Sequence, residues 1–401
     1  MEKTWRWFGK EDIIELAMLK QIGVEGVVTA LHYIENGQVW PLEDILNLKA
    51  FIEKAGLRWS VVESLPVSEP IKYGGDDRDI LIDNYISSLE NLGKCGIRTV
   101  CYNFMPVIDW VRTDLEYKLE DGSCSLYFNR SKFIYFDLYI LDREGAGADY
   151  TEEELQHAAQ LHRTISETER QTLIDAIILK TQGFINGNIS EKDKDPIVKF
   201  KQLLKLYAEV DKSVLRNNMK YFLQRIMPVC EKYKINMCVH PDDPPFSLLG
   251  LPRIVTNEED ISWILAAVDH PSNRLTFCAG SLSAGIQNDV AALASKFVAR
   301  TSFVHLRSTD IKSNGDFVEA SHLEGRGSLI DVVRIFEKEK PNVPMRIDHG
   351  RLMQEDKGKK YNPGYSFLGR MLALGQMQGV IAAVQNELNQ NSRTFKSFKN
   401  E

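Results

Sequence analysis

Four side chains that can bind a metal ion follow short apolar stretches in the second half of the chain. These residues are His240, Cys278, His305 and Asp348. Imidazole, thiolate and carboxylate groups are all ligands of first-row divalent metal ions. Taken singly, each has an ordinary explanation, because a polar residue at a strand end is usually hydrogen-bonded and a lone cysteine usually packs as a small apolar side chain. Their recurrence after successive stretches favours a shared metal site.

The ligand set does not select one metal. A thiolate with two imidazoles favours zinc or iron(II) by softness, whereas the carboxylate also suits manganese(II). In each case the ion would act as a Lewis acid that has room for the oxygens of a substrate.

These residues can meet only if the strands that carry them lie side by side. Strand-like stretches alternate with helical stretches, and they cover residues 4–9, 23–31, 57–64, 97–104, 235–240, 275–280, 301–308 and 343–350. Such alternation predicts right-handed crossovers and a parallel sheet. Eight repeats favour a (β/α)8 barrel, whose active sites lie at the carboxyl ends of the strands. An open doubly wound sheet is the alternative, but no glycine-rich dinucleotide turn follows the first stretch.

The interval between the fourth and fifth strands is several times longer than one crossover. Residues 115–205 are polar and charged with helical patches, so we expect a helical insertion in one barrel domain that spans residues 1–401. It would cap the barrel or form a homo-oligomer contact. His157 and His162 in this insertion are five residues apart, which places them on different faces of a helix and argues against a metal site there.

Polar and aromatic side chains also gather at the expected carboxyl ends of the other strands. Such a rim suits a small polyhydroxylated ligand. We expect substrate contacts from Trp5, Arg6, His32, Glu63, Asn103 and Arg307. For Trp5, packing inside the barrel is an equally good interpretation.

Two residues near the fourth presumed ligand could transfer protons. His349 directly follows Asp348, and Tyr365 stands at the start of the last predicted helix, with Tyr361 as an alternative. A tyrosine close to a cation can ionise below its usual pKa of about 10.

Composition and charge exclude several classes of protein. Hydrophobic residues make up 43% and charged residues 26%, and the formal net charge of −7 argues against nucleic acid or anionic membrane partners. The chain opens with no apolar signal-like run and contains no uninterrupted apolar stretch of about 18 residues, so no spanning helix is expected. The six cysteines form no CxxC pair, which is typical of reduced thiols in the cytoplasm.

Several longer motifs resemble the bacterial mannonate dehydratases of hexuronate (glucuronate) breakdown, and the resemblance runs nearly from end to end. The motifs are "TWRWFG" (4–9), "GVVTALHYIENGQVW" (26–40), "CVHPDDPPFSLLGLPRIV" (238–255), "FCAGSLSAG" (277–285), "FVHLRS" (303–308), "DHG" (348–350) and "NPGYS" (362–366). The resemblance implies a xylose-isomerase-like barrel in the cytoplasm. It implies dehydration of D-mannonate to 2-dehydro-3-deoxy-D-gluconate with manganese(II) or iron(II).

By the same resemblance, the ligands would be His240, Cys278, His305 and Asp348. His349 and Tyr365 would be the proton-transfer pair. We expect Tyr365 to take the C2 proton and His349 to protonate the leaving C3 hydroxyl, although the reverse assignment is an alternative.

Two other functions compete with dehydration. A metal-dependent sugar isomerase or epimerase would use the same barrel and metal, and a non-catalytic sensor would bind a sugar acid without converting it. The two proton-transfer residues argue against the sensor, because a protein that only binds has no need of them. A metal-dependent abasic-site nuclease is disfavoured because the chain is acidic.

Overall fold

Eight parallel strands form a closed barrel in the computed structural model, which describes residues 1–181, 189 and 193–397. The ring runs β1-β12-β9-β8-β7-β4-β3-β2, and pairing of β1 with β12 closes it. The strands are β1 (Glu2–Arg6), β2 (Gly26–Thr29), β3 (Arg58–Glu63), β4 (Thr99–Tyr102), β7 (Asn236–Val239), β8 (Asn273–Cys278), β9 (Thr301–Leu306) and β12 (Pro344–Ile347). The predicted (β/α)8 barrel is therefore confirmed.

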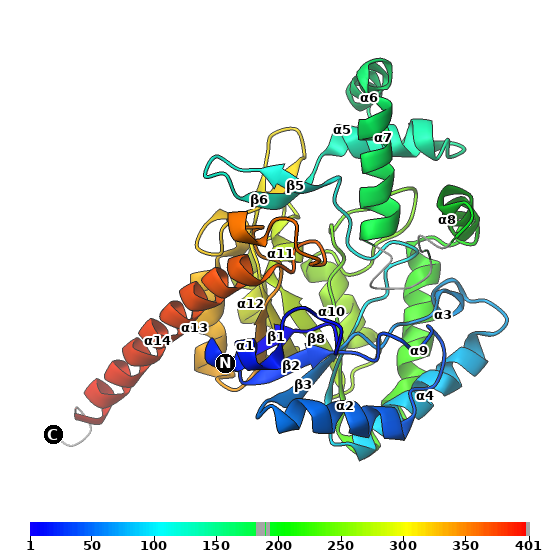
Figure 1. Cartoon of the computed structure of the whole chain (residues 1–401). Coiled ribbons are helices and arrows are strands. Elements are labelled where there is room, and N and C mark those ends of the chain that lie inside the picture. Colours follow the sequence, from blue (N-terminus) through cyan, green and yellow to red (C-terminus); the bar gives the residue numbers. More distant parts are fainter. Residues whose placement is uncertain (182–188, 190–192, 398–401) are drawn as a thin grey trace.

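Helices cover the outside of the barrel (Figure 1). The main ones are α1 (Leu16–Gln21), α2 (Leu42–Lys54), α4 (Arg78–Lys94), α9 (Lys212–Tyr233), α10 (Glu258–Ala267), α12 (Val290–Phe297), α13 (Leu329–Glu339) and α14 (Phe367–Ser397). In α2 the buried residues Ile45, Leu48 and Ile52 recur at helical spacing and share one face. Burying each of these side chains stabilises the fold by roughly 2 kcal/mol.

The inside of the barrel changes from apolar to polar along each strand. Val61 of β3, Cys101 of β4 and Phe303 of β9 belong to a small buried apolar cluster. Because successive side chains on a strand alternate between its faces, the residue two positions further on points to the same side. Those next residues include Glu63 on β3 and His305 on β9. The inward side chains of these strands are therefore apolar in the middle of the barrel and polar at its carboxyl end.

The segment between β4 and β7 contains a β-hairpin as well as helices. The sequence predicts only helices here, but β5 (Asp114–Lys118) and β6 (Cys124–Phe128) come first. The helices that follow are α5 (Arg130–Tyr135), α6 (Glu152–Thr164), α7 (Glu167–Ile174) and α8 (Pro196–Lys205). Capping boxes begin two of them, formed by Thr151 with Glu154 and by Ser166 with Glu169, and such caps set where a helix begins.

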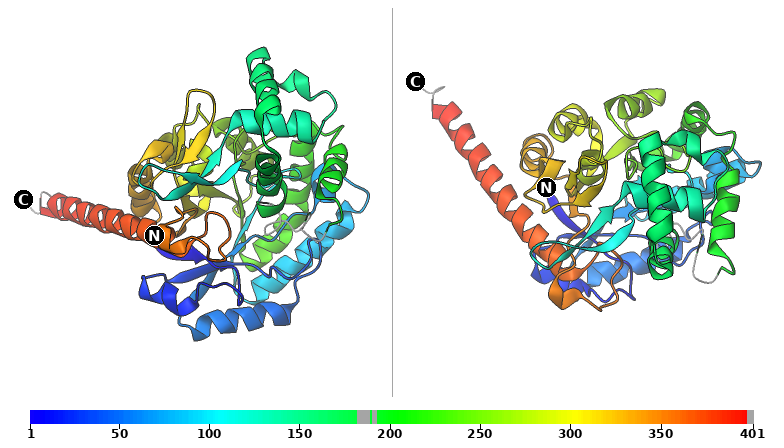
Figure 2. Two further views of the ribbon diagram at one scale, coloured as in Figure 1. Left: turned by 45° about the horizontal axis from the view of Figure 1, so that its top comes forward. Right: turned by 90° about the horizontal axis from the view of Figure 1, so that it is seen from above.

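This hairpin belongs to a second, antiparallel sheet with the order β10-β11-β6-β5. The strands β10 (Thr309–Ile311) and β11 (Phe317–Glu319) follow barrel strand β9, so the sheet joins two segments that are distant in the sequence. Phe128 of β6 stacks on Phe317 of β11 with ring centroids 5.2 Å apart. Both segments leave carboxyl ends of barrel strands, and Figures 1 and 2 show the sheet and the insertion helices on the same side of the molecule.

The last helix is longer than the sequence predicts. Residues 364–383 are expected to be helical, whereas α14 extends over Phe367–Ser397 and its distal part projects from the body (Figures 1 and 2). Its stretch Phe367–Gln390 is long and apolar enough to cross a membrane by length and composition alone. Ile381 and Val384 are buried inside the protein, as in a core helix that packs on one face.

Candidate active site

The structure brings the four predicted metal ligands together at the carboxyl end of the barrel. The ligand atoms of His240, Cys278 and His305 all lie within 4.8 Å of one another. His240 Nε2 is 3.1 Å from His305 Nδ1, and Cys278 Sγ is 3.7 Å from Asp348 Oδ2. Their register explains the convergence, because Cys278 pairs with His305 across β8 and β9.

Local hydrogen bonds orient these donors. His240 Nδ1 lies 2.7 Å from the Pro241 carbonyl oxygen, so Nδ1 carries the hydrogen and Nε2 is left for a ligand. Cys278 caps the short helix α11 (Ala279–Ser283), and its sulfur accepts hydrogen bonds from the Ser281 backbone N–H and hydroxyl. The arrangement presents an imidazole nitrogen and a sulfur to the same point.

The two histidines carry opposite electrostatic shifts. Burial would lower the pKa of His240, but the adjacent Cys278 and Asp348 raise it to about 9. Burial, with Arg346 nearby, holds the pKa of His305 well below its usual value. His305 presents Nδ1 to this point, 3.1 Å from His240 Nε2 and 4.0 Å from Asp348 Oδ2. A divalent cation could take the place of the hydrogen between the two imidazoles and bind these converging donors, so the residue set fits a metal ion.

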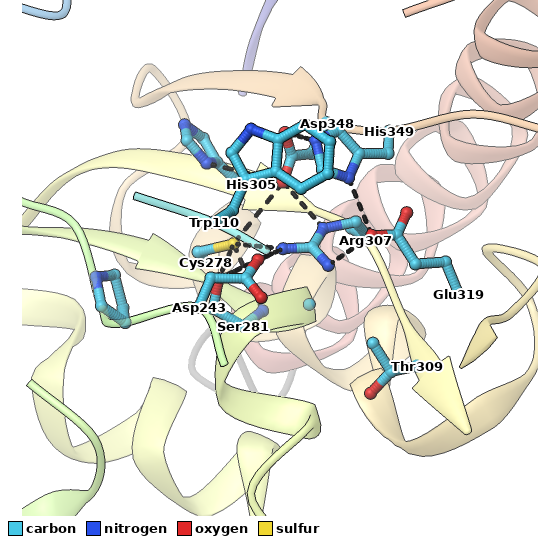
Figure 3. Close-up of polar contacts among 12 residues, drawn as sticks. Trp110, Asp243, Cys278, Ser281, His305, Arg307, Thr309, Glu319, Asp348 and His349 are labelled. Atoms are coloured by element: carbon cyan, nitrogen blue, oxygen red, sulfur yellow. Dashed lines mark hydrogen bonds and ion pairs between the residues drawn. The ribbon is translucent and has the colours of Figure 1, made fainter. Parts of the chain in front are cut away.

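Arginines and carboxylates surround the donors in a buried cluster. Its members are Arg6, Arg112, Arg307 and Arg346 together with Glu63, Asp243, Glu319 and Asp348. Four positive and four negative charges balance formally, as buried charges must. Figure 3 shows Arg307 at the centre, linked to Asp243, Glu319 and Asp348.

Asp348 is held by two guanidinium groups. Arg346 Nη1 donates to Oδ1 at 2.6 Å, and Arg307 Nε donates to Oδ2 at 2.8 Å. Burial would raise the pKa of Asp348, but Arg346, His349 and Arg307 hold it well below its usual value. The group is therefore a carboxylate that can bind a cation.

The two predicted proton-transfer residues lie side by side. The rings of His349 and Tyr365 meet edge to face, with centroids 5.1 Å apart. His349 Nδ1 is 2.8 Å from Glu319 Oε1, and His349 Nε2 is 3.8 Å from Asp348 Oδ1. Burial raises the pKa of the Tyr365 hydroxyl, and the nearby Arg346 lowers it in part. Tyr361, the alternative to Tyr365, lines a separate cavity beside β6.

One pocket contains most of the predicted site. Arg6, Glu63, Asn103 and Arg307 line it together with His349 and Tyr365. Trp5 does not line it, because strand alternation puts Trp5 on the opposite face of β1 from Arg6. The Trp5 ring is fully buried, and the Arg370 guanidinium lies 4.0 Å from its centroid, which is the arrangement of a side chain that packs in the interior. His32 lies outside the lining in the loop after β2, with its ring centroid 5.8 Å from that of Phe8.

Sequence reasoning missed several residues that shape this pocket. They are Asp109, Trp110, Asp243 and Arg346, which line it, and Arg112 and Glu319, which lie behind it. The "HPDDPP" motif contained a signal for Asp243, because its carboxylate directly follows a ligand-bearing strand. Arg346 was also detectable, since it precedes Asp348 by one strand period. Glu319 had no such signal, because no strand was predicted around it.

Comparisons with known proteins agree over nearly the full length. Residues 1–391 match the family model described as D-mannonate dehydratase (UxuA). A mannonate dehydratase of Marinomonas sp. is 44% identical over 97% of this chain and 100% of its own. Another, from Chromohalobacter salexigens, is 42% identical over 96% of this chain and 99% of its own.

A solved structure shows the same architecture. The crystal structure of mannonate dehydratase from Streptococcus suis serotype 2 is 32% identical, covers 97% of this chain and 96% of its own, and superposes with a TM-score of 0.77. Sequence, family model and architecture lead to the same assignment, and the chain belongs to the D-mannonate dehydratase family of hydro-lyases.

Proposed function

We propose that this protein removes water from D-mannonate and forms 2-dehydro-3-deoxy-D-gluconate in the pocket at the carboxyl end of the barrel. The observation that carries this proposal is a single pocket in which metal donors adjoin a histidine and a tyrosine suited to proton transfer. His240, Asp348, His349 and Tyr365 all line it. Elimination needs this combination, because one proton must leave carbon and another must reach the departing hydroxide.

We assign the metal to His240, Cys278, His305 and Asp348, and we expect manganese(II), with iron(II) as the alternative. Zinc also matches the donors by softness. When bound, such an ion supplies a Lewis acid that favours negative charge on substrate oxygens. The buried position of Cys278 and His305 supports the assignment, because unligated polar groups are costly there.

Tyr365 and His349 divide the proton transfers in this proposal. The C2–H bond breaks as its proton passes to the Tyr365 oxygen, and the C3–O bond breaks as His349 protonates the leaving hydroxide. The resulting enol becomes the 2-keto acid as C3 takes up a proton and the C2 hydroxyl loses one. Tyr365 must ionise first, which burial opposes and the guanidinium groups of Arg346 and Arg6 favour. The reverse assignment remains the alternative.

Arg6 and Asn103 are the substrate contacts that the geometry supports best. Arg6 is buried, and its Nε has no hydrogen-bond partner among the described residues, so it can donate to a substrate oxygen. The donors of Arg307 are already taken by three carboxylates. We therefore assign Arg307, like Glu63 beneath Arg346, to holding the site rather than to substrate contact.

The cellular setting follows from the same chemistry. All six cysteines are free thiols, including Cys278, so we expect the protein to work in the reducing cytoplasm. We treat the chain as one barrel domain over residues 1–401. Whether residues 115–205 make a homo-oligomer contact stays a prediction.

The test is a turnover assay on metal-defined protein. The protein is stripped with chelator, reloaded anaerobically with Mn2+, and given D-mannonate, and 2-keto-3-deoxy acid is measured. We expect product only after metal is restored. An epimeric sugar acid without loss of water would instead show an epimerase, and binding without any product would show a sensor.

Exchange of the C2 hydrogen with solvent separates the two proton-transfer roles. If Tyr365 is the base, Tyr365→Phe loses exchange and dehydration together, while His349→Asn retains exchange and lowers dehydration to a slow residual rate. Tyr361→Phe is the matched control, because Tyr361 lies in the neighbouring cavity, and it should retain both. Exchange that survives in Tyr365→Phe would contradict our assignment of the base.

A further inference from the structure

We propose that Glu319, on β11 of the second sheet, is a positioning residue that fixes the ring and tautomer of His349. This inference rests on the proposed function, in which His349 protonates the leaving hydroxide. Glu319 lies outside the barrel, and the proposed reaction does not itself require a residue from the second sheet. Figure 3 shows its carboxylate between Arg307 and His349.

One oxygen of Glu319 serves three donors. Oε1 accepts from His349 Nδ1 at 2.8 Å, from Arg112 Nη2 at 2.8 Å and from Arg307 Nη1 at 3.0 Å. The side chain is buried, which opposes a charge, but His349 and the guanidinium groups of Arg307 and Arg112 lower its pKa and keep it ionised. An ionised carboxylate can only accept hydrogen bonds, so the hydrogen between it and His349 belongs to Nδ1.

This hydrogen bond leaves Nε2 as the working nitrogen of His349. Nε2 lies on the pocket side, 3.8 Å from Asp348 Oδ1, where a substrate held by the donors would be in reach. A neutral histidine has one donor and one acceptor nitrogen, and its partner decides which is which. To act as the acid, His349 must carry a hydrogen on both nitrogens and give up the one on Nε2, which leaves the form with hydrogen on Nδ1. Without Glu319, either nitrogen could release its hydrogen, and only part of the population would release it from Nε2.

Packing restricts the ring but cannot choose its tautomer. Trp110 lies with its ring centroid 4.8 Å from that of His349, and Tyr365 stands at 85° to it on another side. A Cβ at Gly364 would come within 2.9 Å of the imidazole, so only glycine leaves room for it there. These contacts are apolar or aromatic, and the choice between nitrogens depends on Glu319.

The backbone of Glu319 is itself fixed by the second sheet. It pairs with Thr309 of β10, and the Ser125 hydroxyl of β6 donates to its carbonyl oxygen at 2.7 Å. The sheet therefore holds the carboxylate that orients a residue of the barrel. Orientation by a partner of this kind is worth about 10- to 100-fold in metal and catalytic sites.

The matched control for Glu319 is Asp243. Its carboxylate accepts from Arg112 and Arg307, the same two arginines, but no hydrogen bond joins it to His349 in the part of the chain that the structure describes. Removing either acid takes one carboxylate away from these two arginines. Only the removal of Glu319 also frees His349.

The experiment is a double-mutant cycle on the Mn2+-loaded full chain. We expect Glu319→Ala to lower the rate of D-mannonate dehydration about 10- to 100-fold in the wild-type background and not at all in a His349→Asn background. Asp243→Ala should cost the same factor in both backgrounds. An equal loss for Glu319→Ala in both backgrounds would overturn the proposal. A His349→Asn variant with undiminished dehydration would instead refute the proposed role of His349.

A spectroscopic readout covers variants that fold poorly. Glu319→Gln keeps the shape and one oxygen acceptor, so it should retain the fold and lose less activity than Glu319→Ala. In zinc-loaded protein with 15N-labelled histidine, the wild type should show His349 with hydrogen on Nδ1. Glu319→Ala should show a mixture of tautomers, while Asp243→Asn keeps the wild-type signal. Retention of the single tautomer in folded Glu319→Ala overturns the proposal.

Discussion

The barrel and the second sheet contribute to the pocket in different ways. Barrel strands provide the side chains that would touch metal and substrate, such as Cys278 on β8 and His305 on β9. The second sheet and the segment that leads into it provide side chains that touch those residues instead, such as Arg112 and Glu319. The barrel therefore provides the groups that contact the reactants, and the second sheet provides the groups that orient them.

The two regions also differ in how firmly they hold their residues. β8 and β9 are six-residue strands paired on both sides within a closed ring, whereas β10 and β11 are three-residue strands at the carboxyl end of the barrel. Short strands in connecting loops tolerate change better than a closed barrel does. Substitutions in the barrel should therefore abolish the reaction, and those around the second sheet should reduce it.

The largest effect is expected from Cys278→Ala. Losing the thiolate should remove most of the bound metal and lower dehydration by roughly 10³-fold, because the Lewis acid contributes several kcal/mol. Metal content after dialysis and initial rates measure both. Cys238→Ala is the control, since Cys238 is equally buried in β7 but does not belong to the donor group. Full metal occupancy in Cys278→Ala would contradict the assignment of this barrel residue as a metal ligand.

An intermediate effect is expected from Arg112→Lys. Arg112 bridges Asp243 and Glu319 with separate nitrogens, at 2.8 Å each, and a lysine cannot reach both with the same geometry. Dehydration should fall about 10- to 100-fold while metal stays bound. Arg143→Lys, which replaces a similar paired guanidinium beside Asp137 in the insertion, should change neither quantity. Loss of metal in Arg112→Lys would mean that orientation and binding are not separate.

The smallest effect on catalysis is expected at His322, in the loop after β11. Burial lowers the pKa of His322 to about 4 from 6.5, and its Nε2 lies 2.9 Å from the Leu306 carbonyl oxygen. The unfolded chain therefore takes up the proton first. The stability from His322 is present above pH 6.5 and is lost as the pH falls towards 4, on the order of 1 kcal/mol per pH unit.

His322→Gln should remove this part of the pH dependence without changing dehydration at neutral pH. Denaturant unfolding of both proteins at several pH values between 4 and 7 measures the difference in slope. Parallel stability curves for the two proteins would show that His322 is not the group responsible.

The barrel part of the site was predictable because its pattern is local. Eight alternations of strand and helix place the carboxyl ends of the strands together, and the residue types at those ends, such as His305 and Asp348, then point to a metal. The two interpretations of Trp5 depend on which face of its strand it occupies. That face became clear only from the boundaries and pairing of β1 in the structure.

The second sheet was not predictable in the same way. β11 is three residues long, too short for a periodic pattern, and its partner β6 lies in a segment where helical signals dominate. Ser125 and Glu319, which share a hydrogen bond, are 194 residues apart in the sequence. A single sequence contains no local signal for such a pairing, so Glu319 and Arg112 became visible only in the folded protein.

The position of the candidate ligands along the chain has a consequence for biosynthesis. All four come after β4, in the part of the protein that a ribosome makes last. Since domains begin to fold from the amino-terminal end during synthesis, a half-made chain with the first four strands carries none of these ligands. The full donor group forms only when β12 closes the ring, and an ion cannot be captured at this site by a chain that ends before β7.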